Sequence, residues 1–192
     1  EQTATKDVSE VAATESEKAN KLFDEIFMEG VNRSPIFQTY LGIKTDYDKW
    51  NDLSEANAEK ELDFTKSNLE RIKVIDVSKL DAHTKLSYQL FKQSLEDNIA
   101  DYKWRHHTYP VNQMFGVHSQ IPSLLINQHR ISDTKEAQDY IARLKGVELF
   151  LAQLIEQLKI RENKGIIAPK FVYEHVIRDS KNLLVGAPFT EG

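Results

Sequence analysis

The sequence of 192 residues contains no cysteine. This absence excludes a disulfide-bonded scaffold, a zinc or iron–sulfur site with thiolate ligands, and catalysis by a cysteine nucleophile. It leaves the cellular compartment open, because proteins without disulfides occur in every compartment. Glycine and proline are also scarce, at seven and five residues, against an average combined share of roughly 12%. This shortage of turn-forming residues favours helices.

Long apolar runs and basic clusters are missing as well. No apolar stretch approaches the roughly 18 to 20 residues that a membrane-spanning helix needs. The formal net charge is −5, and the lysines and arginines are scattered along the chain, so we expect no nucleic-acid partner. The sequence also lacks GxSxG, P-loop, GxGxxG and HExxH motifs. It therefore shows no sign of the common hydrolase, nucleotide-binding or zinc-peptidase machinery.

Apolar residues between the two ends recur at a spacing of three and four, which is typical of amphipathic helices. This spacing, with Ser34, Ser54, Asp81 and Asp133 as helix caps, predicts the following helices. They cover residues 19–27, 35–40, 54–73, 81–107, 133–165 and 169–184. Glu136 stands three residues after Asp133, which has the form of a capping box. The sequence thus predicts an all-α fold, an irregular bundle of about five to seven helices with no significant sheet.

The two ends differ from this helical middle, which we assign to one domain over residues 18–184. Residues 1–17 are mostly Ser, Thr, Ala and acids, so we interpret them as a polar tether. The first residue is Glu, which favours a chain whose secretory or lipoprotein signal has been removed, and an ordinary frayed terminus is the alternative. Residues 185–192 stop on turn residues, so we expect the N-terminal half of a larger protein, truncated there.

Residues 109–130 form the exception to the helical pattern. They hold two of the five prolines and no sustained helical period, although a short helix over 123–128 is expected. The amide groups of Asn112 and Gln113 and the imidazole of His118 stand among apolar residues, a mixture expected where a loop lines a polar cleft. The alternative is that the two amides only satisfy backbone groups in a buried connector.

The six histidines give no metal-binding pattern. None are paired at i and i+4, and the adjacent His106 and His107 point about 100° apart on a helix, which favours surface or helix-end positions. His118 and His129 flank the irregular segment, but no carboxylate accompanies them at a suitable spacing. We therefore predict no catalytic residue and no metal ligand in this chain.

The order of several short motifs resembles the N-terminal half of a large bacterial family known as domain of unknown function 885. The motifs are Ser34-Pro35, Leu41-Gly42, Trp50-Asn51-Asp52, Ser87-Tyr88, Tyr109 to His118, Ile121-Pro122, Asp139 to Leu144 and Gly165 to Lys170. Each is weak alone, but together they follow the family's order from about Leu22 to Leu184.

The resemblance implies an activity that this chain does not carry by itself. Members are longer, helical and similar to zinc carboxypeptidase-like metallopeptidases, with an HExxH helix and a further glutamate ligand in their C-terminal half. The resemblance therefore places no metal or catalytic residue here. It implies that Asn112, Gln113 and Gly116, with the neighbouring His118, face the substrate cleft, and that residues 139–144 form a structural helix.

We therefore expect the substrate-cleft half of a bacterial zinc metallopeptidase, inactive alone, with the zinc in the missing C-terminal half. Its partners would be a peptide or small-molecule substrate and that half. Contact with a membrane is expected only through an N-terminal lipid anchor, and the location would be the cell envelope or periplasm. The alternative is a non-enzymatic, membrane-anchored lipoprotein domain for helical interaction or ligand binding.

Overall fold

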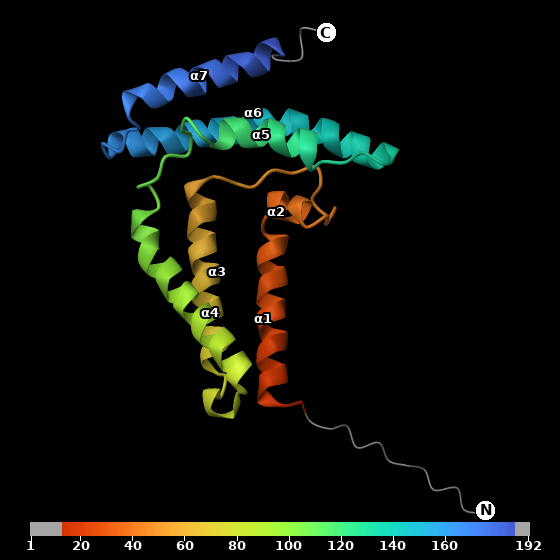
Figure 1. Ribbon diagram of the computed structural model, residues 1–192, viewed down its shortest axis with the longest axis vertical. Helices are drawn as coiled ribbons and strands as arrows, with labels where there is room; N and C mark the ends of the chain where they lie inside the picture. The colour runs from red at the N-terminus through yellow and green to blue at the C-terminus, as the bar shows by residue number, and fades with distance from the viewer. Residues whose placement is uncertain (1–12, 187–192) are drawn as a thin grey trace, which may run out of the picture.

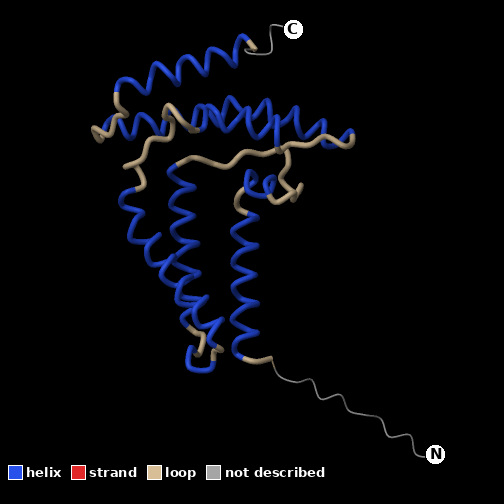
Figure 2. Tube along the Cα trace, in the orientation of Figure 1, coloured by secondary structure: helices blue, strands red, loops and turns tan. Residues whose placement is uncertain are grey.

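The computed structural model describes residues 13–186, which form seven α-helices and two single 3-10 turns. The helices are α1 (Glu15–Asn32), α2 (Pro35–Tyr40), α3 (Glu55–Lys73), α4 (Ala82–Asp101), α5 (Val117–Asn127), α6 (Thr134–Asn163) and α7 (Lys170–Val185). The 3-10 turns lie at Val77–Lys79 and Tyr102–Trp104. Figure 2 shows helices joined by loops, and no strand in the described part of the chain. The predicted all-α fold is confirmed for these residues.

The helices form two groups that lie across each other. Figure 1 shows α1, α3 and α4 with roughly aligned axes, α3 running opposite to the other two, and α5, α6 and α7 stacked across their upper ends. The short α2 and the loop that follows it lie where the two groups meet. This arrangement gives the molecule two separate apolar cores, one in each group of helices.

The first core lies between α1, α3 and α4. Ile26, Ile72 and Leu95, one from each helix, are buried in it. Phe23 of α1 and Phe91 of α4 meet edge to face, with ring centroids 5.5 Å apart. Apolar burial of this kind is the main stabilising term for such a bundle.

The second core lies between α5, α6 and the loop between α2 and α3. Ile121 and Leu125 of α5 and Phe150 of α6 are buried together, and the indole of Trp50 stacks on Phe150 with centroids 4.9 Å apart. Gly146, one turn before Phe150, makes room for this indole, because a Cβ there would lie 3.0 Å from Cδ1 of Trp50.

The predicted helix caps are present. Ser34, Ser54, Asp81 and Asp133 each accept a hydrogen bond from a backbone N–H in the first turn of their helix. The capping box expected at Asp133 is incomplete, however. The carboxylate of Glu136 instead accepts from the backbone N–H and hydroxyl of Ser132.

A complete capping box occurs at the start of α1, between Thr14 and Glu17. It starts the helix at Glu15, so the last three residues of the expected tether, 1–17, are helical. Residues 1–12 of that tether lie outside the described residues. At the other end, Gly186 caps α7 in a left-handed conformation, and the rest of the expected truncated end, 187–192, also lies outside them.

Three of the predicted helices have other bounds. The helix expected over residues 19–27 spans Glu15–Asn32. The helix expected to reach residue 107 ends at Asp101, and a 3-10 turn follows. The helix expected over residues 123–128 begins at Val117 and contains Pro122 in its interior. A proline inside a helix removes one hydrogen bond, which made residues 117–122 look irregular. Burial of Ile121 and of the neighbouring leucines against α6 offsets that loss.

Arg143 of α6 joins the two groups of helices. Its side chain is completely buried, with a relative exposure of 0%. Nε donates to the carbonyl of Lys49 at 3.0 Å, and Nη2 donates to Oγ1 of Thr39 at 2.9 Å. Nη1 donates to Nδ1 of His129 at 3.0 Å. Within residues 13–186, no carboxylate lies within ion-pairing distance of this guanidinium, so neutral acceptors hold the charge.

His129 is part of the same network. Its Nε2 donates to the carbonyl of Glu136 at 3.3 Å, which leaves Nδ1 free of a proton to accept from Arg143. Burial lowers the pKa of His129, which favours this neutral form. The ring stacks on Tyr47 with centroids 3.9 Å apart. His129, considered above beside His118, therefore helps to hold the fold.

None of the helices within residues 13–186 is long and apolar enough to cross a membrane.

We expect Arg143→Ala to lower the free energy of unfolding by about 3–5 kcal/mol, because it leaves buried acceptors without donors. Arg143→Lys keeps the charge but has no planar fork, and should cost about 2 kcal/mol. Arg130→Ala, at an exposed side chain, is the control and should change stability by less than about 0.5 kcal/mol. Urea unfolding measures all three. A wild-type stability for Arg143→Lys would contradict the role of the network.

Candidate functional site

Asn112 shapes the loop between the 3-10 turn and α5. Its Oδ1 accepts hydrogen bonds from the backbone N–H groups of Met114 and Phe115, at 2.8 and 3.0 Å. Its backbone N–H donates to the carbonyl of Phe115 at 3.0 Å. Just outside this turn, an isolated antiparallel bridge joins Val111 to Gly116. The loop is thus a short hairpin whose turn is held by one asparagine side chain.

Gly116 closes the hairpin and starts α5. Its φ is +149°, and a Cβ at this position would lie 2.7 Å from the carbonyl oxygen of Pro110 and 2.7 Å from Cα of Val111. Both the backbone conformation and the space favour glycine. The same residue stands before α5 as its N-cap, so the hairpin and the helix depend on one position.

The other two predicted site residues lie at different depths. Gln113 is exposed at the tip of the hairpin, beside Met114 and Phe115, which are 77% and 61% exposed. His118 lies half-buried in the first turn of α5, and its buried Nδ1 has no hydrogen-bond partner within residues 13–186. Burial lowers the pKa of His118 below its ordinary value, and the negative charge of Asp179 in α7 opposes this effect only in part. The structure thus places Asn112, Gln113 and Gly116 in the hairpin and His118 at the start of α5, and of these four residues Gln113 is the exposed one.

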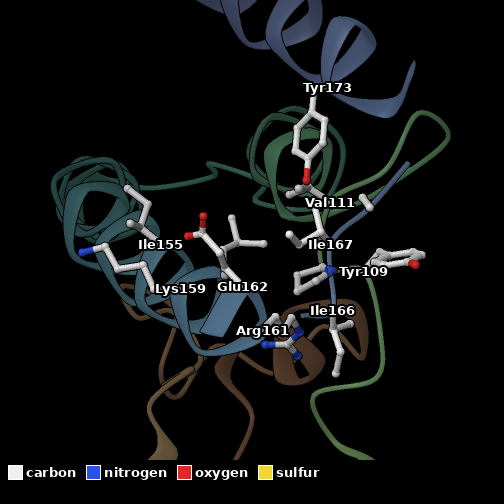
Figure 3. Close-up of a pocket in the computed structure, with 12 residues that line it drawn as sticks. Tyr109, Val111, Ile155, Lys159, Arg161, Glu162, Ile166, Ile167 and Tyr173 are labelled. Atoms are coloured by element: carbon white, nitrogen blue, oxygen red, sulfur yellow. The ribbon is translucent and has the colours of Figure 1, made fainter. Parts of the chain in front are cut away.

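An apolar pocket of about 460 Å³ lies behind the base of this hairpin. Residues 109–111, the C-terminal half of α6, residues 166–168 and Tyr173 of α7 form its walls (Figure 3). Its size falls within the range of pockets that hold small ligands or single side chains. The two motifs Tyr109 to His118 and Gly165 to Lys170, which lie far apart in the sequence, meet here.

Arg161 of α6 holds the backbone that directly precedes residues 109–111. Nε donates to the carbonyl of Thr108 at 3.1 Å, and Nη2 donates to the carbonyl of Arg105 at 3.2 Å and to Oγ1 of Thr108 at 3.3 Å. Nη1 donates twice to Gln157, to its carbonyl and its Oε1. A guanidinium has five N–H donors, so all of them are used within the protein.

Glu55, the first residue of α3, holds residues 105 and 106, which follow the 3-10 turn Tyr102–Trp104. Its carboxylate accepts from Nε2 of His106 at 2.9 Å, from Gln157 at 2.9 Å and from Arg105 at 3.0 Å. Burial raises the pKa of Glu55, but these hydrogen bonds outweigh it and lower the pKa to about 2. His106 is only 4% exposed, so the surface position considered for it was wrong. It lies just past the end of the 3-10 turn Tyr102–Trp104, where the pairing with Glu55 allows the imidazole to be buried.

Within residues 13–186, no three His, Cys, Asp or Glu side chains are grouped so that they could hold a metal ion. The pocket, the contacts of Arg161 and the Glu55 network are not predicted by the sequence. Arg161 contacts Thr108, 53 positions away, and Glu55 contacts His106, 51 positions away, whereas periodicity reports only neighbours along the chain.

The fold and the site together define an all-helical domain that presents a fixed hairpin beside an apolar pocket. Residues 35–192 match the model of the family described as "Bacterial protein of unknown function (DUF885)". The chain belongs to this family, so the family membership that the short motifs indicated is confirmed. No curated protein and no solved structure matches the chain.

Gly116→Ala should lower the free energy of unfolding by roughly 1–3 kcal/mol, because the new Cβ meets fixed backbone atoms. Gly30→Ala is a matched control. A Cβ at Gly30, in α1, has its nearest neighbour at 4.0 Å, so that variant should be neutral or stabilised by up to about 1 kcal/mol. Thermal or urea unfolding compares them. Equal stability of the two variants would contradict the tight closure of the hairpin.

The Glu55 network should make stability depend on acid. The pKa of Glu55 is lower in the folded chain than its ordinary 4.5, so between about pH 5 and pH 2 the unfolded chain binds more protons. The stabilisation is complete above that range and is lost as pH falls through it. We expect the stability difference between wild type and Glu55→Gln to shrink over this range in urea titrations. A difference that stays constant would contradict the pairing.

Proposed function

We propose that this chain forms one wall of the substrate cleft of a bacterial zinc metallopeptidase, and that the zinc-binding HExxH helix belongs to a further part of the protein. The described residues offer no group of His, Asp and Glu ligands for the metal. They do not fit a zinc site, and the role we propose for them is to bind and orient substrate. We further propose a location in the cell envelope or periplasm, as a secreted protein or lipoprotein.

The hairpin at residues 111–116 is the observation that carries the proposal. Asn112 holds its turn through two backbone hydrogen bonds, and Gly116 holds its base. Gln113, Met114 and Phe115 are therefore displayed on an ordered loop, which lowers the entropy cost of binding a partner.

The chemistry of the hairpin tip suits an extended peptide. The amide of Gln113 can both donate to and accept from a peptide backbone. Exposed Met114 and Phe115 supply apolar area beside it, and covering them would exclude water. Positioning of this kind contributes to catalysis by holding the scissile bond in place.

The same exposed side chains also favour a second function. Met114 and Phe115, which are adjacent at the tip of the hairpin, are both largely exposed. Exposed apolar side chains near one another are typical of surfaces that bind other proteins. A non-enzymatic, membrane-anchored interaction or ligand-binding domain would use this surface without any peptidase chemistry.

The gene sequence that follows Gly192 separates the two functions. The peptidase proposal expects an HExxH motif and a downstream glutamate, because two histidines one helical turn apart and a third ligand hold zinc. A stop codon after Gly192, or a continuation without these ligands, would contradict the proposal and leave the interaction domain.

Gln113 and Asn112 should respond differently to substitution in the complete enzyme. Gln113→Ala removes an exposed amide, so kcat/KM for a peptide should fall by the equivalent of about 1–3 kcal/mol with an almost unchanged Tm. Asn112→Ala removes the side chain that holds the turn, so Tm should fall. Peptide kinetics and thermal unfolding give the two readouts. A lowered Tm with unchanged kinetics for Gln113→Ala would show that this amide is structural.

A further inference from the structure

The pocket behind the hairpin has one charged group available to a ligand. Glu162 is an exposed residue that lines the pocket. In Figure 3 its carboxylate lies on the side of Ile155, while the ammonium of Lys159 points away from the pocket. Within residues 13–186, no cation lies within ion-pairing distance of Glu162, whereas Lys159 pairs with Glu156 at 2.7 Å. The negative charge of Glu162 is therefore left for a ligand to pair with.

Arg161, the buried one of the three charged residues that line the pocket, is not available. Arg161 is 8% exposed, and all five of its N–H groups donate hydrogen bonds to Thr108, Arg105 and Gln157. An anionic ligand would therefore find no guanidinium donor here and would meet the carboxylate of Glu162. Because Lys159 is paired and the donors of Arg161 are used, the unpaired charge at the pocket is that of Glu162, which favours a cation.

The rest of the lining is suited to an apolar body. Ile155, Leu158 and Ile167 line the pocket. Tyr173 reaches down from α7, with its hydroxyl pointing toward Val111 (Figure 3), and no hydrogen bond is made by this hydroxyl within the described residues. An aromatic face beside an apolar wall can attract a cation as well as pack against a ring.

We propose that this pocket binds a hydrophobic monocation, an apolar group of about one large side chain that carries a primary ammonium. The ammonium pairs with Glu162, and the apolar body lies between Ile155 and Ile167. Two sources have this chemistry, the N-terminal residue of a peptide and a free aromatic amine. The link to a peptide rests on the proposed role as a cleft wall, but the pocket's preference for a cation does not.

Titration of the 192-residue chain with two matched probes tests the preference. Phenethylamine and 3-phenylpropionate share a phenyl ring and a two-carbon linker and carry opposite charge at neutral pH. Heteronuclear NMR should show phenethylamine perturbing the amide signals of the pocket residues, with an affinity about fivefold or more above that of 3-phenylpropionate. Equal or stronger binding of the anion, or no binding of either probe, would overturn the proposal.

Glu162→Gln keeps the shape of the side chain and removes its charge. In this variant the preference for phenethylamine should fall to about onefold, while binding of the phenyl ring remains. Glu148→Gln is the matched control, since Glu148 is an exposed glutamate on the same helix that does not line the pocket. Loss of the preference in both variants would mean that the chain's overall negative charge causes it, and would overturn the assignment to Glu162.

A second pair of probes identifies the source of the ammonium. L-phenylalaninamide has the free α-ammonium of a peptide N-terminus, and N-acetyl-L-phenylalaninamide has it blocked. Binding of the first but not the second supports a peptide N-terminus, and binding of phenethylamine alone supports a free amine. If N-acetyl-L-phenylalaninamide binds as tightly as L-phenylalaninamide, the pocket does not require a cation and the proposal is overturned. These titrations require no peptidase activity, so their result is independent of the gene-sequence test.

Discussion

The guanidinium of Arg143 has to satisfy its donors inside the protein, because it has no exposed surface. Leaving such donors unpaired would cost several kcal/mol. They reach the backbone of the loop after α2, the hydroxyl of Thr39 and the ring of His129. These contacts hold that loop against α6, and α6 in turn carries Arg161 and one wall of the pocket. The position of the candidate site thus depends on how one buried arginine is satisfied.

Most of the fold could be predicted because its signals are local. A helix shows its apolar face within a few turns, and caps such as Ser34, Ser54 and Asp81 act on backbone groups three residues away. Asn112 also acts locally, and one of the two roles considered for it, bonding to neighbouring backbone groups, is the role that its Oδ1 has in the structure. The order of short motifs was sufficient to recognise the family.

The rest could not be predicted because it depends on contacts between distant parts of the chain. In the sequence, Arg143 and His106 look like ordinary polar residues of a helix. Their burial can be inferred only once their distant partners, Lys49 and Glu55, are known. Pro122 suggested an irregular loop, since the packing that compensates for it comes from α6. Residues 109–111 line the pocket together with Glu162 and Tyr173. The spacing of apolar residues along the chain does not indicate that these segments meet.

The position of a bound ligand tests the account most directly, because it depends on the hairpin, on Arg161 and on Glu162 together. A crystal structure of the chain with L-phenylalaninamide is the measurement. We expect density for the phenyl ring between Ile155 and Ile167, with the ammonium about 3 Å from the carboxylate of Glu162. Density elsewhere, such as the groove between α1, α3 and α4 lined by Phe27 and Phe64, or an empty pocket at saturating ligand, would contradict it.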